Sequence, residues 1–180
     1  MDAAAMLHLL EEKPFSEFTV REICREARTT TITFYAHYED KYSLAKEIFQ
    51  DLAEEAAARF LNMQENNNKD KDMSQTCCNL LDGILAVLSA VKDDYTLSLK
   101  NLDPYLFVTM SQIIIEKISD FQISTDLPVS FPYHQLSSFF CFGLWGYICD
   151  GLHQEHPIEL IQCEGKRLIR AIITSSYTWG

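Results

Sequence analysis

The sequence predicts an all-α protein, and three observations lead to that fold class. Apolar residues recur every three or four positions, the spacing of an amphipathic helix, along most of the 180-residue chain. Only six glycines and five prolines interrupt this pattern. No Asn-Gly or Asp-Gly pair joins two alternating apolar runs, so no β-hairpin is predicted.

Composition and charge narrow the class of protein further. Hydrophobic residues make up 47% of the chain and aromatic residues 12%, which excludes a disordered acidic tail. The formal net charge of −11 excludes binding to nucleic acid or to an anionic membrane by overall charge, so any DNA contact must come from a local patch. The N-terminus lacks the basic start and apolar core of a signal peptide, and no long apolar run predicts a membrane span. We therefore expect a cytoplasmic protein.

The first two helices are predicted from the residues at their ends. Apolar residues at helical spacing indicate a helix over residues 2–13, which Pro14 ends. Thr19 and Glu22 have the spacing of a capping box, in which the threonine hydroxyl accepts a backbone hydrogen bond and the glutamate carboxylate reaches back. A second, short helix is therefore expected over residues 20–27.

Two more helices complete the N-terminal half. A break over residues 28–31 precedes a third short helix, residues 31–38. Asp40 is placed to cap a long helix that reaches about residue 65. The polar, low-complexity residues 66–72 are expected to form a loop, and they are a candidate domain boundary.

The second half is predicted to hold four more helices. Ser74 is placed to cap the first, and Asp103-Pro104 begins the next because proline is favoured at the first helical position. Two prolines make residues 124–132 a loop. The helices are expected over residues 74–91, 103–123, 133–154 and 156–177.

The two short helices around residues 28–31 indicate a function. Short helices joined by a tight turn, with small polar side chains on the second, are typical of a helix-turn-helix, whose second helix enters the major groove of DNA. Such a helix needs exposed hydrogen-bonding groups outside and apolar anchors behind. The exposed hydroxyls would come from Thr29, Thr30, Thr31 and Thr33. The side chains that donate hydrogen bonds to DNA phosphates would be Tyr35, His37 and Lys41. The buried anchor would consist of Ile23, Ala27 and either Ile32 or Phe34.

One consistent spacing links a larger set of N-terminal residues: Thr19, Ile23, Ala27, Thr33-Phe34-Tyr35, His37-Tyr38, Asp40-Lys41 and Leu44. In this pattern residues 15–49 resemble the DNA-binding domain of TetR-family transcriptional regulators. The resemblance implies a three-helix helix-turn-helix DNA-binding domain, residues 1–46. A long helix would join it to a C-terminal helical ligand-sensing and dimerisation domain, residues 47–180. It also implies a homodimeric, sequence-specific transcription regulator of the repressor type with a pseudo-palindromic DNA operator.

The resemblance assigns DNA-binding roles to particular residues. Thr19 would meet a phosphate, Thr30, Thr31 and Thr33 would face base edges, and Tyr35, His37 and Lys41 would fix the register on the backbone, with Arg28 in the turn. Arg, Lys, Asn and Gln are missing between Thr29 and Ala36, so an AT-rich or shape-read operator is expected. Arg28 and Thr29 depart from the family pattern, which usually has a glycine and an aliphatic residue there.

Aromatic residues are concentrated in the second half, with eleven between Tyr95 and Tyr147. Such a concentration is more often plain core than a ligand site. TetR-like proteins, however, hold an inducer between the middle helices of the second domain. The resemblance therefore implies a site for a small apolar or aromatic effector, without a further cofactor, and the candidate walls are Phe107, Met110, Ile114, Phe142 and Trp145.

The last two predicted helices have the pattern of a dimerisation pair. Residues 139–151 are apolar nearly all round, which indicates burial on more than one face. The last helix repeats apolar residues at the spacing of a helix-bundle seam. An intrachain core would give the same pattern, but we expect dimer contact through Gly143, Gly146, Tyr147, Ile161, Gly165, Leu168 and Ile172.

Other functions have weaker support. The six cysteines show no CxxC spacing, and the group Cys149, His153, His156 and Cys163 matches no zinc motif, so no metal is expected. Without a P-loop, a glycine fingerprint, an HExxH motif or a nucleophile elbow, an enzyme is not predicted. Arg28 and Thr29 leave open an alternative: a helical ligand-binding or protein-interaction module with a degenerate DNA-binding head.

Overall fold

The computed structural model describes residues 3–94, 108–109, 112–113, 115–116 and 133–176, and within them all regular structure is helical. The elements are α1 (Ala3–Glu12), the 3₁₀ helix η1 (Phe15–Glu17), α2 (Val20–Glu26), α3 (Thr31–His37), α4 (Lys41–Asn67), α5 (Met73–Asp94), α7 (Tyr133–His153) and α8 (Ile158–Ser176). The predicted all-α fold class is confirmed.

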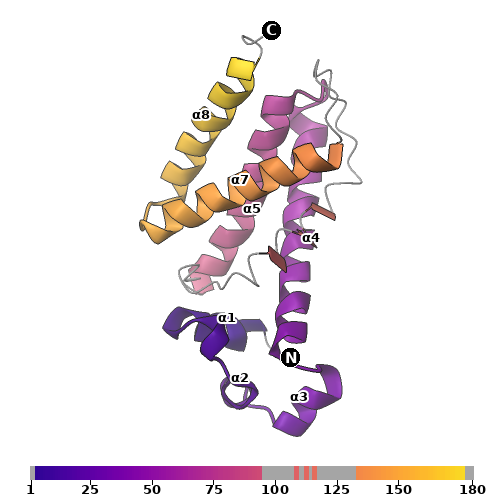
Figure 1. The fold of residues 1–180 in the computed structure, drawn as a ribbon, viewed down its shortest axis with the longest axis vertical. Helices are drawn as coiled ribbons and strands as arrows, with labels where there is room; N and C mark the ends of the chain where they lie inside the picture. The colour runs from indigo at the N-terminus through magenta and orange to yellow at the C-terminus, as the bar shows by residue number, and fades with distance from the viewer. Residues whose placement is uncertain (1–2, 95–107, 110–111, 114, 117–132, 177–180) are drawn as a thin grey trace.

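The helices form a three-helix head and a larger helical body (Figure 1). In the head, α2 packs against both α1 and α3. The long helix α4 leaves the head and packs along α5, while α8 packs on α5 and on α7. Helix α4 is therefore the element that joins the head to the body, as expected. Within the described ranges, helices are too short or too polar to cross a membrane.

The head is held together by one apolar core to which every element contributes. Phe15 of η1 and Phe34 of α3 are fully buried in it, and the Phe15 ring meets the rings of Phe18 and Tyr42 edge-on, with centroids 5.5 and 5.2 Å away. Further buried members are Met6, Leu10, Ile23 and Leu44. Since these residues lie on separate helices, the core fixes the angles at which α1, α2 and α3 meet.

The turn between α4 and α5 differs from the expected loop at residues 66–72. Helix α4 continues to Asn67, and Asp72 caps α5, because its Oδ1 accepts a hydrogen bond of 2.7 Å from the backbone N–H of Gln75. The prediction that Ser74 caps this helix was wrong: the aspartate two positions earlier provides the acceptor.

A buried amide network lies beside this turn. Gln64, Asn68, Thr76 and Asn79 are all buried. The Thr76 hydroxyl oxygen accepts from the amides of Asn68 at 2.8 Å and of Gln64 at 3.0 Å, and the Asn79 amide donates to Gln64 Oε1. Because buried polar groups are costly without partners, the network explains how so polar a segment packs between two helices.

Candidate functional site

The turn between α2 and α3 is built around a left-handed residue. Arg28 has a φ of 49°. The N–H of Thr29 donates to the Cys24 carbonyl at 2.9 Å and the N–H of Arg28 to the Arg25 carbonyl at 3.2 Å. This pair of hydrogen bonds is the Schellman motif, in which glycine usually occupies the left-handed position. Arg28 therefore adopts the left-handed conformation that costs a non-glycine residue free energy.

Both short helices begin with a threonine cap. Thr19 and Glu22 form the predicted capping box at the start of α2. At α3, Thr30 Oγ1 accepts from the backbone N–H of Thr33 at 3.1 Å and lies 3.0 Å from the Thr33 hydroxyl. The hydroxyls of Thr30 and Thr33 therefore share a hydrogen bond within the protein, whereas the sequence predicted that both would face base edges.

Helix α3 buries one side and exposes the other. Phe34 and Tyr38 are buried, and the Tyr38 hydroxyl donates to Glu47 on α4 at 2.7 Å. Phe34 is therefore the anchor that the sequence left undecided, because Ile32 is 82% exposed.

The predicted DNA-contacting side chains mostly lie on the open side of this unit. Tyr35 is 60% exposed, Arg28, Thr30, Thr33 and His37 are exposed, and Thr31 is half-buried.

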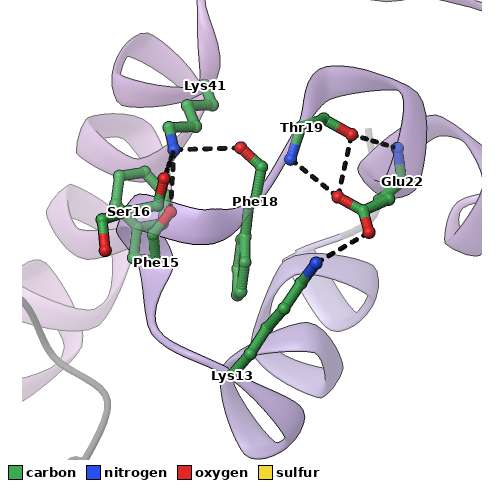
Figure 2. A network of polar contacts seen from close by, with 7 residues as sticks. All are labelled: Lys13, Phe15, Ser16, Phe18, Thr19, Glu22 and Lys41. Atoms are coloured by element: carbon green, nitrogen blue, oxygen red, sulfur yellow. Dashed lines mark hydrogen bonds and ion pairs between the residues drawn. The ribbon is translucent and has the colours of Figure 1, made fainter.

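Thr19 is fully engaged with Glu22 (Figure 2). Its hydroxyl donates to Glu22 Oε2 at 2.8 Å, and its backbone N–H donates to the same oxygen at 2.9 Å. Lys13 of α1 donates to the other carboxylate oxygen at 2.7 Å. These hydrogen bonds, that from Lys13 first, lower the pKa of Glu22 to about 2. A carboxylate therefore already occupies the start of α2, where a phosphate was expected.

Lys41 is also turned inward (Figure 2). Its ammonium group donates to the backbone carbonyls of Phe15 at 2.8 Å, Ser16 at 3.0 Å and Phe18 at 3.0 Å. It also lies 4.7 Å from the centroid of the Phe15 ring. Three ammonium protons meet three carbonyl oxygens, so this geometry favours a tie between α4 and η1 over the predicted phosphate contact.

The candidate effector site is only partly described. Phe107, Met110 and Ile114 lie outside the described residues. Trp145 is buried and lines a cavity of about 20 Å³ between α4, α5 and α7, with Leu52, Ala53, Ala56, Ile84, Val87 and Leu88 as the other walls. Phe142 is exposed and is not among those walls. Phe142 therefore lies outside this cavity, which as it stands has room for about one water molecule.

The candidate dimerisation residues fall into two groups. Tyr147, Ile161 and Gly165 belong to the intrachain core: Ile161 is buried, and the Tyr147 hydroxyl donates to its carbonyl at 3.1 Å. A Cβ added to Gly165 would lie 2.8 Å from both Leu81 and Tyr147. This geometry favours an intrachain role for these three residues over the predicted dimer contact, because α8 uses that face to pack on α5 and α7.

The other group faces outward. Gly143 and Gly146 on α7 have open space where a Cβ would stand. Leu168 and Ile172 on α8 are 47% and 48% exposed, and Phe139 on α7 is 70% exposed. We refer to these exposed residues of the two helices together as the exposed apolar face of α7 and α8.

The cysteines and the candidate metal ligands form no metal-binding group in the described part of the chain. Cys24, Cys77, Cys78 and Cys141 are buried, and all six are free thiols. Burial raises the pKa of Cys77 and Cys141 to about 12. Among the described residues, His, Cys, Asp and Glu side chains nowhere gather in a group of three or more that could hold a metal ion.

Comparison with known proteins bears on the head. Residues 1–48 match the family model of bacterial regulatory proteins of the tetR family. Among solved structures, the TetR family repressor AlkX from Dietzia sp. strain DQ12-45-1b, implicated in biodegradation of n-alkanes, is 16% identical, with a TM-score of 0.47 over 95% of this chain and 94% of that chain. Among curated proteins, no match was found. The matched segment contains α1, α2 and α3, so it is the head that is similar to the bacterial regulatory proteins of the tetR family.

Proposed function

We propose that this protein is a homodimeric, sequence-specific DNA-binding transcription regulator of the repressor type, acting in the cytoplasm. The observation that carries the proposal is the α2–turn–α3 unit inside the family-matched segment, with Tyr35, Thr33 and His37 exposed on α3. Local charge is compatible with this role. Residues 19–46 carry five basic and four acidic side chains, whereas residues 47–180 carry nine and 18. Contact with DNA would thus be confined to the head.

Dimerisation is proposed through the exposed apolar face of α7 and α8. Large apolar side chains are exposed at Phe139, Leu168 and Ile172. Exposed apolar surface is unfavourable in water, and contiguous patches of it mark interaction sites. The open glycines Gly143 and Gly146 would let a second copy approach α7 closely. A two-fold dimer would present two α3 helices to half-sites about 34–36 Å apart on a pseudo-palindromic operator.

The effector is proposed to be small and apolar or aromatic. Trp145 and its aliphatic neighbours supply an apolar lining between α4, α5 and α7. Because α4 also carries the head, a ligand that enlarges this cavity would act on the helix that positions α3. The ligand would then shift the balance between DNA-competent and DNA-incompetent arrangements of the two heads.

The test is selection of duplexes from a random DNA library by the full-length protein, followed by affinity measurements on the enriched sequence. Enrichment of a pseudo-palindrome is expected, with binding lost in Tyr35→Ala and weakened in His37→Ala. His153→Ala, an exposed histidine at the end of α7, is the matched control and should bind normally. Failure of a folded, dimeric protein to enrich any sequence would favour the degenerate-head alternative.

The dimer has its own test. Phe139→Glu and Leu168→Glu should give monomers in sedimentation velocity, because each would place a charge in the proposed interface. Leu61→Glu, at a 42% exposed position on α4, is the control and should leave the oligomeric state unchanged. If all three variants sediment like the parent, the exposed apolar face of α7 and α8 is not the dimer interface.

A further inference from the structure

Ile32 is the most exposed of the large apolar side chains that the structure describes, at 82%. Among residues 12–50 only one other large apolar side chain is exposed, and it is Tyr35 on the same helix. A single exposed isoleucine is common on protein surfaces. Two exposed large apolar side chains on one seven-residue helix, when the others within residues 12–50 are buried or partly buried, indicate a surface that makes contacts.

The position of Ile32 on α3 makes it the centre of that surface. Phe34 and Tyr38, four residues apart, mark the buried side of α3. At 3.6 residues per turn, Ile32 and Ala36 fall on the opposite side of the helix. Both are exposed, so the outermost line of α3 is formed by an isoleucine and an alanine without hydrogen-bonding groups.

The hydroxyl groups near this line are partly committed inside the protein. Thr30 and Thr33 share a hydrogen bond, and Thr30 caps the helix through the Thr33 backbone N–H. Their capacity to read base edges is therefore reduced. What α3 offers directly outward is an aliphatic group, with the small Ala36 allowing close approach.

Only one chemical group on a base edge in the major groove matches such a side chain. The C5-methyl of thymine is apolar and projects into the groove, whereas, apart from the smaller C5–H of cytosine, the groups that distinguish the base pairs there are hydrogen-bond donors and acceptors. We infer that Ile32 is a specificity-determining residue that recognises the C5-methyl group of a thymine in the operator half-site. This inference rests on the proposed function and adds to it the residue and the chemical group that select the sequence.

The experiment removes that methyl group from the DNA. In the operator enriched by selection, each thymine is replaced singly by deoxyuridine, which keeps the base pair and lacks only the C5-methyl. The affinity of the parent protein should fall at one or two positions of each half-site, by about fourfold for each contacting methyl removed, as expected for a group of that size. This scan needs no protein variant, so it cannot be confused with misfolding.

Protein variants then assign the effect to Ile32. Ile32→Ala should bind the thymine operator more weakly and show no further decrease at the sensitive deoxyuridine position, whereas Ile32→Val should keep part of the response. Leu61→Ala, the matched aliphatic control on α4, should keep the full response. A flat deoxyuridine scan with the parent protein, or an Ile32→Ala variant that keeps the full response, would overturn the inference while leaving the proposed function standing. Failure to enrich any operator would instead count against the proposed function itself.

Discussion

Replacing Lys41 with methionine would remove the ammonium group from the head while keeping most of the side-chain length. Three hydrogen bonds from a charged donor to carbonyl oxygens, at 2.8, 3.0 and 3.0 Å, would disappear. In isolation each could contribute about 1.5–3 kcal/mol. The site is only partly buried, so water will rehydrate the freed carbonyls, and the methionine can still pack near the Phe15 ring. We therefore expect the free energy of unfolding to fall by about 2 kcal/mol in total, well below the sum.

The measurement is urea unfolding of the full-length protein, followed by circular dichroism, with thermal unfolding alongside. A destabilisation of about 2 kcal/mol corresponds to a decrease of about 4–8 °C in Tm for a chain of this size. Native-state hydrogen exchange should show reduced protection first in the amides of η1, α2 and the start of α4. Lys46→Met, at an exposed position on the same helix, is the control and should change the free energy of unfolding by less than about 0.5 kcal/mol.

The contrary outcome would come from a lysine that contacts phosphate, as the family pattern implies. In that case Lys41→Met would leave the unfolding free energy unchanged. It would instead lower the slope of log affinity against log salt by about one for each phosphate that the side chain had neutralised. That pair of results would refute the internal role of Lys41.

Three further changes test other features. Arg28→Gly should raise the free energy of unfolding in urea by about 1 kcal/mol, because glycine accepts the left-handed φ of 49°. The control Arg25→Gly, inside α2, should lower the free energy of unfolding by a similar amount. If both variants changed the free energy of unfolding equally, the strain argument would be contradicted. Gly165→Ala should lower the free energy of unfolding by about 1–3 kcal/mol, because the added Cβ has no room. Gly146→Ala has room for its Cβ, so it should raise the Tm of the monomer and, if α7 lies in the interface, weaken the dimer. The parent should have a higher free energy of unfolding than Glu22→Gln above pH 4.5, and this difference should disappear as the pH falls toward 2. The reason is that the folded-state pKa of Glu22 lies at about 2, below its ordinary value of 4.5. A difference that stays constant across about pH 2–5 in urea titrations would contradict this.

The features that the sequence predicted well are encoded in a few neighbouring residues. The capping box at Thr19 and Glu22 depends on residues three positions apart, and the structure confirms it. Arg28 stands where the family pattern usually has glycine, and its left-handed φ shows that the arginine adopts the conformation that favours glycine. Local hydrogen bonds of this kind depend on spacing, which a sequence displays directly.

The features that the sequence missed depend on contacts between distant residues. Nothing near Lys41 in the chain shows that its ammonium group meets carbonyls 23 to 26 positions away. On α8, one apolar repeat contains Ile161 and Gly165, which face the chain's own core, and Leu168 and Ile172, which are exposed. Helical spacing alone cannot separate two such faces, because their residues lie within one turn of each other. For the same reason it could not decide between Ile32 and Phe34.

The buried amide network at the α4–α5 turn limits how these two helices can move. Sliding α4 along α5 by one residue would separate Gln64 from Thr76 and Asn79, and each buried amide left without a partner costs about 1–3 kcal/mol. Tilting the two helices together leaves every one of these hydrogen bonds intact. At the end far from the head, α4 and α5 are therefore expected to move together as one rigid unit. A displacement that reaches the head must then bend α4 along its length or rotate the pair as a whole.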